Sequence, residues 1–127
     1  MKFAPVLGSL VLFGVIVQII IGFQVSAGVD ELIGTHILIG VIGLFLVLTL
    51  TAMAFRSKSA TIFPKIIMVI LTLVDLVQIG LGFQLLNGAD ALGMSHQANA
   101  FVILGLSLLI GAITMKAAKK QSSPSSS

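Results

Sequence analysis

Cysteine, tryptophan and tyrosine are all absent from this 127-residue chain, and charged residues make up only 9% of it. Without cysteine, disulfide bonds, iron–sulfur clusters and thiolate metal sites are excluded. Without tryptophan and tyrosine, the aromatic belts that flank many membrane spans must come from phenylalanine or be missing. A water-soluble domain carries about 25% charged residues. A chain with so few charges cannot cover a water-facing surface, so lipid must be the solvent for most of it.

Four long apolar runs occupy most of the chain. They cover roughly residues 6–25, 32–55, 66–86 and 92–115. A helix needs about 20 apolar residues to cross about 30 Å of hydrocarbon. Because short connections make neighbouring helices antiparallel, the sequence predicts an all-α membrane protein, a four-transmembrane-helix up-down bundle. We assign one domain to residues 1–120 and expect the Ser-rich tail at 121–127 to be disordered.

The charged residues predict how the bundle is oriented. The basic residues lie at the N-terminus, in the connection at 56–65 or near the C-terminus, and they are Lys2, Arg56, Lys58, Lys65, Lys116, Lys119 and Lys120. The other two connections carry Asp30, Glu31 and Asp90. Cytoplasmic loops are enriched in Lys and Arg, so we expect a multi-pass protein of the cell membrane with both termini cytoplasmic. Basic residues confined to the ends of apolar runs form no nucleic-acid-binding patch.

An internal repeat is the strongest pattern in the sequence. Residues 17–36 read VQIIIGFQVSAGVDELIGTH, residues 77–96 read VQIGLGFQLLNGADALGMSH, and ten of the twenty positions are identical. The shared Gln, Asp and His count most, because such residues are rare and costly in membrane spans. We therefore predict two tandem helix-hairpin repeats, at about 4–56 and 64–116.

His36 and His96 are equivalent in the two copies and lie about one turn inside the outer ends of their helices. Copies of two spans each run in the same direction, related by an axis along the membrane normal. The two imidazoles should therefore face each other at equal depth. Haem iron takes two axial protein ligands, often His, so we predict bis-His binding of a haem, of the b type, near the outer face. The alternative is a pair of interfacial side chains that reach water.

Small residues follow both histidines. Gly40 and Ala100 each lie four residues after a histidine, on the same helix face as its ring. They leave room for a macrocycle, or they let helices pack closely without any ligand. The sequence favours neither interpretation over the other.

Four glutamines belong to the repeat. Gln18 and Gln78 are candidates to face the cofactor or to hydrogen-bond between helices. Gln24 and Gln84 lie nearer the outer ends and are candidates for hydrogen bonds to the imidazoles or to haem propionates.

Asp75 breaks the repeat, because its counterpart is Val15. An ionisable residue inside a membrane span is a functional candidate, so Asp75 is predicted to handle protons or to contact a quinone. The alternative is a neutral acid that bonds to Gln78.

The segments QIIIGFQVSAG and QIGLGFQLLNG, each followed by a histidine, resemble the helix–loop–His pattern of the heme A synthase family. The resemblance covers most of this chain and one four-helix half of that family's duplicated bundle. It implies haem-ligating histidines near the outer ends of the second and fourth helices, at His36 and His96. That family typically carries a Glu three residues before the first His and an Arg just after it, where this chain has Ile33 and Ile37. The resemblance therefore implies haem binding, while the pattern associated with oxidising a haem methyl group is missing.

Several functional hypotheses remain open. The first is a membrane b-type cytochrome that transfers electrons or handles haem, in contact with the lipid bilayer and with a quinone or a respiratory-chain protein. The second is a heme A synthase-like oxidoreductase, and the third is a cofactor-free membrane subunit or assembly factor. A small transporter and a homo-oligomer are further alternatives. Zinc is a poor fit, since two histidines supply only half of a four-coordinate site.

Overall fold

The computed structural model describes residues 4–58 and 60–122. Its α-helices are α1 (Ala4–Ser26), α2 (Ile33–Arg56), α3 (Ile62–Leu86) and α4 (Gly93–Ser122), with short 3-10 helices η1 (Asp30–Leu32) and η2 (Asp90–Leu92) before α2 and α4. No strand occurs in these ranges. All four helices are long and apolar enough to cross a membrane. The prediction of an all-α protein with four helices that could each cross a membrane is confirmed.

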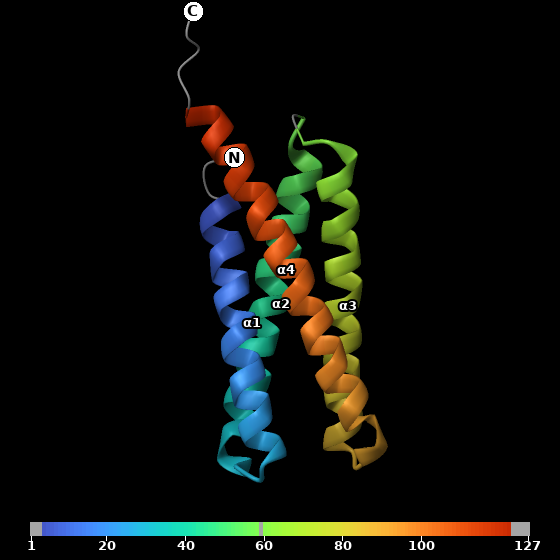
Figure 1. Cartoon of the computed structure of the whole chain (residues 1–127). Helices are drawn as coiled ribbons and strands as arrows, with labels where there is room; N and C mark the ends of the chain where they lie inside the picture. The colour runs from blue at the N-terminus through green and yellow to red at the C-terminus, as the bar shows by residue number, and fades with distance from the viewer. Residues whose placement is uncertain (1–3, 59, 123–127) are drawn as a thin grey trace, which may run out of the picture.

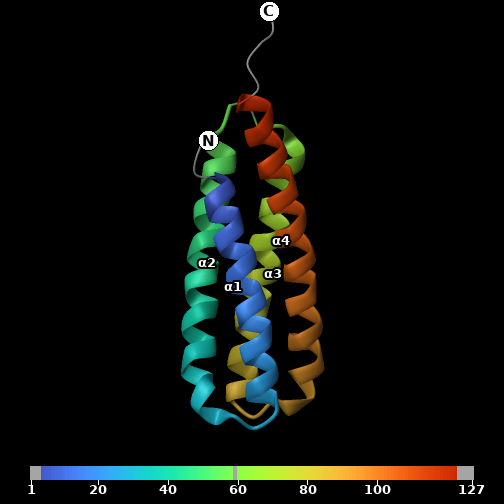
Figure 2. The same cartoon turned by 60° about the vertical axis from the view of Figure 1, so that its left-hand side comes forward.

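The helices form a four-membered ring rather than a layer. α1 packs against α2 and α4, and α3 packs against the same two helices, while the diagonal pairs α1/α3 and α2/α4 make no direct backbone approach in the described chain. The chain ends and the α2–α3 connection lie at one end, and η1 and η2 lie at the other (Figure 1, Figure 2). Below we call these the terminal end and the turn end.

Both turns at the turn end are built in the same way. Gly28 and Gly88 have φ of 94° and 85°, a left-handed conformation that costs least in glycine. The N–H groups of Gly28 and Val29 donate to the carbonyls of Val25 and Gln24, the paired bonds of a Schellman motif. Gly88 and Ala89 donate to Leu85 and Gln84 in the same pattern. The shared glycine of the two sequence segments is therefore required by the backbone of each turn.

Two helix boundaries differ from the sequence prediction. α3 begins at Ile62 rather than near residue 66, and Pro64 is its third residue, where the missing N–H breaks no hydrogen bond. α4 runs to Ser122, beyond the apolar run that ends near residue 115. The first two residues of the predicted disordered tail are therefore helical, and residues 123–127 lie outside the described residues.

The tightly packed core lies in the half of the bundle nearer the terminal end. Its buried apolar side chains come from all four helices and are Ala4, Val11, Val47, Leu50, Ala54, Ile67, Met68, Leu71, Ile103 and Ile110. A hydroxyl pair joins α2 to α3 within it, because Thr51 Oγ1 lies 3.0 Å from Thr72 Oγ1. Each hydroxyl also lies within hydrogen-bond distance of a carbonyl of its own helix, so one hydroxyl can donate to the other while that other donates to its carbonyl.

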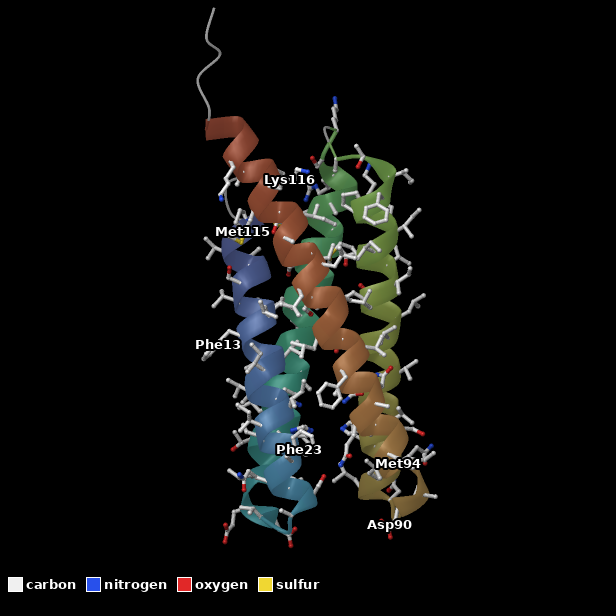
Figure 3. The ribbon with its side chains drawn as sticks, in the orientation of Figure 1. Phe13, Phe23, Asp90, Met94, Met115 and Lys116 are labelled. Atoms are coloured by element: carbon white, nitrogen blue, oxygen red, sulfur yellow. The ribbon has the colours of Figure 1, made fainter. Side chains whose placement is uncertain are left out.

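The outer surface is apolar along the middle of the helices and charged at its ends. Phe13 is 66% exposed and points away from the bundle (Figure 3). Lys116 and Asp90 lie toward opposite ends of the molecule in the same view (Figure 3). An exposed apolar middle is expected where lipid covers the helices.

Candidate functional site

The half of the bundle nearer the turn end is hollow. The α1–α2 hairpin and the α3–α4 hairpin spread apart toward their turns (Figure 1), and a cavity of about 660 Å³ lies between them, lined by all four helices. Aliphatic side chains form most of the wall, and polar side chains enter it from His36, His96, Gln18, Gln78 and Asp75. Cavities of roughly 300–1,000 Å³ with a few converging polar groups are typical of ligand and cofactor sites.

His36 and His96 meet in this cavity. They come from α2 and α4, the diagonal pair of helices, yet their ring centroids are 6.0 Å apart and their planes are inclined at 63°. The Nδ1 atom of each ring is buried and has no hydrogen-bond partner among the described residues. Two imidazoles from opposite helices thus approach each other across the interior of the bundle.

Each imidazole lies against a glycine of the neighbouring helix in its own hairpin. A Cβ atom placed at Gly22 on α1 would lie 3.1 Å from Cε1 of His36, and one placed at Gly82 on α3 would lie 3.4 Å from Cε1 of His96. A side chain at Gly22 would therefore displace the His36 ring, whereas a Cβ atom at Gly82 would be near ordinary van der Waals contact with the His96 ring. Because they have no side chain, the two glycines let the imidazoles lie close to α1 and α3.

Gln18 spans from α1 to α2 without touching the His36 ring. Its Nε2 donates to the backbone carbonyl of His36 at 2.8 Å. The amide reaches that carbonyl across Gly40, where a Cβ atom would lie 3.0 Å from Gln18 Nε2. Gly40 therefore makes room for a helix-to-helix hydrogen bond, and it also lines the cavity.

Gln78 takes a different course in the second hairpin. Its Nε2 lies 3.3 Å from Nε2 of His96, and its Oε1 accepts a hydrogen bond of 2.8 Å from Asn99 Nδ2. Ala100 stands where the first hairpin has Gly40. Gln78 turns instead to the His96 ring, so only the second imidazole is held by a glutamine side chain.

Gln24 and Gln84 are not brought to the histidines. Both side chains are exposed and neither lines the cavity. Their backbone carbonyls accept the Schellman bonds of the two turns. The structure thus gives these residues a place at the turns and no contact with the imidazoles.

Asp75 lies deeper in the cavity than the histidines. It precedes Gln78 by one helical turn, and its Oδ2 atom is buried without a hydrogen-bond partner among the described residues. The predicted alternative of a bond between Asp75 and Gln78 does not occur there, since the hydrogen bonds of Gln78 go to His96 and Asn99.

Several contacts around the cavity were not anticipated from sequence. Asn99 also donates to the carbonyl of Val74 at 3.0 Å, although the repeat gives it no polar counterpart. On the α1–α4 side, the rings of Phe23 and Phe101 have centroids 6.3 Å apart. Near them Gln97 Nε2 donates to Ser26 Oγ at 3.2 Å. Phe23 lies in the first repeat segment and Gln97 directly follows the second, but how the helices pack sets their partners.

The donor set limits what kind of metal centre could form. No group of three or more His, Cys, Asp or Glu side chains that could hold a metal occurs in ranges 4–58 and 60–122. A metal between His36 and His96 would have two protein ligands, so its other ligands would have to come from a cofactor. A porphyrin supplies four equatorial nitrogens and leaves two axial positions. Comparisons of this chain with protein-family models, with curated proteins and with solved structures gave no match.

Proposed function

We propose that this chain is a membrane haem-binding protein, similar to a b-type cytochrome, in which His36 and His96 supply the two axial ligands of one haem. The observation that carries the proposal is the 6.0 Å separation of the ring centroids across the bundle. Metal–imidazole bonds are about 2 Å long, so rings on opposite sides of one metal have centres on the order of 6 Å apart.

The surroundings of the imidazoles support the same proposal. Both rings open onto a cavity of about 660 Å³, which is within the range that cofactors occupy. Its wall is mainly aliphatic, and Gly40 and Ala100 present no bulky side chain to it. Gly22 and Gly82 let the rings lie close to α1 and α3.

The role we propose is electron transfer or haem handling. A bound haem iron would take up and release single electrons. The chain's residues would fix the two imidazoles, exclude water with aliphatic side chains, and leave the cavity within reach of the bilayer. Methyl oxidation of the kind implied by the heme A synthase resemblance has less support, because Ile33 and Ile37 occupy the positions of the family's Glu and Arg.

Repeat and orientation are part of the proposal. The ten identities between residues 17–36 and 77–96 and the matching turns at Gly28 and Gly88 support two tandem hairpins related by an axis along the membrane normal. Basic residues gather at the terminal end, which we place in the cytoplasm. The histidines then lie near the outer face of the cell membrane.

Absorption spectroscopy tests the proposal. Protein purified from haem-replete cells should show a sharp Soret band and, after reduction, resolved α and β bands of a low-spin bis-His haem. His36→Ala and His96→Ala should each convert the iron to high spin or lose the haem. Gln24→Ala is the matched control, since that side chain is exposed and outside the cavity. A colourless protein that takes up no added haem would leave the cofactor-free subunit as the better account.

A further inference from the structure

An apolar groove runs along the outer surface of α3 at the terminal end of the bundle. Its lining residues are Phe55 of α2 and Ile62, Lys65, Ile66, Val69 and Ile70 of α3. The α3 residues recur at spacings of three and four, so they lie on one face of that helix. All the apolar ones are well exposed, so the groove opens outward. Its volume of about 180 Å³ is below the roughly 300–1,000 Å³ of enclosed ligand pockets, so it would hold one segment of an extended molecule.

Lys65 is the charged residue among those that line the groove. It lies in the first turn of α3, and its Nζ atom lies 6.0 Å from the centre of the Phe55 ring, where the face of an aromatic ring attracts an ammonium group. Ile70 lies five residues further along α3, about 7.5 Å closer to the middle of the bundle. The groove therefore has its positive charge at the terminal end and only apolar side chains below it.

The acidic side chains of this protein all lie away from the groove. Three of the four are in η1 and η2 at the turn end, and the fourth, Asp75, lines the cavity between the hairpins. Arg56 and Lys58, in the same connection as the groove, are exposed and add further positive charge to this end. The negative charge that complements Lys65 must therefore come from outside the chain.

We propose that this groove binds an anionic phospholipid. The lipid phosphate lies against the ammonium group of Lys65, and one acyl chain lies along Ile66, Val69 and Ile70 beside the ring of Phe55. A phospholipid has its charge at the membrane surface and its apolar chain below, which is the same order as in the groove. Basic residues at the ends of membrane spans attract anionic lipids. None of these residues lines the cavity between the hairpins, so the site does not rest on the proposed haem.

Native mass spectrometry of the full-length protein tests the site without any variant. The protein is taken from vesicles that contain equal amounts of phosphatidylglycerol and phosphatidylcholine with the same acyl chains. It should retain one phosphatidylglycerol about five-fold more often than one phosphatidylcholine, the preference expected from one lysine near the membrane surface. Equal retention of the two lipids would overturn the proposal. A dimer without bound lipid would overturn it as well, because the groove would then be covered by a second copy of the chain.

Fluorescence quenching locates the bound lipid, since the chain has no tryptophan or tyrosine of its own. In Phe55→Trp, quenching by brominated lipids should show an affinity for phosphatidylglycerol about five-fold higher than for phosphatidylcholine. Phe63→Trp is the matched control, because Phe63 is similarly exposed on α3 but does not line the groove. There the two affinities should agree within about two-fold. The same preference at both positions would overturn a site in the groove.

Two charge substitutions in the Phe55→Trp protein separate the groove from the general positive charge of this end. Lys65→Gln should abolish the preference for phosphatidylglycerol. Lys58→Gln removes the same charge from an exposed residue outside the groove and should keep at least half of the preference. Equal losses would show that diffuse attraction is sufficient and would overturn the proposal. Any haem spectrum should be unchanged by Lys65→Gln, so the lipid site and the haem site can fail separately.

Discussion

The Cε1 atom of His36 lies close to Gly22, because a Cβ atom built at Gly22 would be only 3.1 Å from it. A Cβ atom built at Gly82 would be 3.4 Å from Cε1 of His96. Contacts of 3.1 Å force a neighbour to move, and contacts of 3.4 Å are close to ordinary van der Waals separation. The two imidazoles therefore have similar surroundings, but His36 lies closer to its glycine than His96 does. Substitutions at the two glycines should have unequal effects.

Gly22→Ala should displace the His36 ring and weaken haem retention more than Gly82→Ala does. Alanine in place of glycine within a helix gains about 0.5–1 kcal/mol from backbone entropy, while overpacking costs about 1–3 kcal/mol. The net change at Gly22 should therefore be destabilising by up to about 2 kcal/mol. Thermal unfolding and the reduced absorption spectrum measure the two effects.

Gly14→Ala is the control for that pair, because its Cβ would meet nothing within 4 Å. Gly14→Ala should gain only the stabilisation from lower backbone entropy in the unfolded chain. It should therefore raise the melting temperature slightly and leave the reduced absorption spectrum unchanged. If Gly14→Ala and Gly22→Ala behaved alike, the close approach to His36 would have no energetic consequence.

Much of the architecture follows from sequence alone. Four continuous apolar runs with almost no charge can be satisfied in lipid only by helices. The pairing of His36 with His96 could also be anticipated, since residues 60 positions apart in two parallel hairpins reach the same depth. The apolar pattern does not predict where α4 ends. Lys and Ala residues beyond residue 115 leave the hydrocarbon but remain good helix formers, so the helix continues to Ser122.

The differences between the two hairpins were beyond sequence reasoning. Gln18 and Gln78 are identical in the repeat, yet one bonds a backbone carbonyl and the other approaches an imidazole. Gln78 Oε1 accepts a hydrogen bond from Asn99 on α4, whereas Gln18 Oε1 has no partner among the described residues. Asn99 donates a hydrogen bond to Gln78, but the equivalent position 60 residues earlier is the apolar Ile39. The repeat therefore gives no sign that Asn99 belongs to the site. Side-chain direction in both cases depends on helix packing that spacing does not specify.

Gly40→Ala should break the hydrogen bond from Gln18 to the His36 carbonyl. The new Cβ would lie 3.0 Å from Gln18 Nε2, so the amide must shift and the hydrogen bond lengthen, and loss of the bond costs about 0.5–1.5 kcal/mol. A double-mutant cycle with Gln18→Leu measures this cost through unfolding free energies. In the Gln18→Leu background, Gly40→Ala should no longer carry this cost and should show only the entropic gain of about 0.5–1 kcal/mol. Additive effects would show that Gly40 acts on something other than Gln18.

Reporter fusions should show that both turns lie on one side of the membrane and the α2–α3 connection on the other. Fusions at residues 29 and 90 are expected to report outside, and a fusion at residue 60 inside, because the basic residues lie at the terminal end. Replacing Arg56, Lys58 and Lys65 by neutral residues should reduce the fraction of chains in this orientation. Inside signals from residues 29 and 90 would move the histidines to the cytoplasmic side.

Gln78→Leu and Gln18→Leu should affect the two imidazoles differently, although the residues are equivalent in the repeat. Gln78 Nε2 lies 3.3 Å from His96 Nε2 and its Oε1 accepts from Asn99, so its loss removes a polar contact of the ring and leaves Asn99 with one acceptor fewer. Gln18 Nε2 donates to the His36 backbone carbonyl, so Gln18→Leu should remove a helix-to-helix bond and leave the ring in place.

Nitrogen-15 NMR of labelled histidines in the haem-free protein distinguishes the two outcomes. Gln78→Leu should shift the ring nitrogen signals of one histidine, which His96→Ala identifies as His96, whereas Gln18→Leu should leave both sets nearly unchanged. Asn99→Leu should reproduce part of the Gln78→Leu shift, because Gln78 is then held by one contact instead of two. Ile39→Leu, at the equivalent position of α2, should reproduce none of it. Equal shifts from Gln18→Leu and Gln78→Leu would contradict the different contacts of the two glutamines.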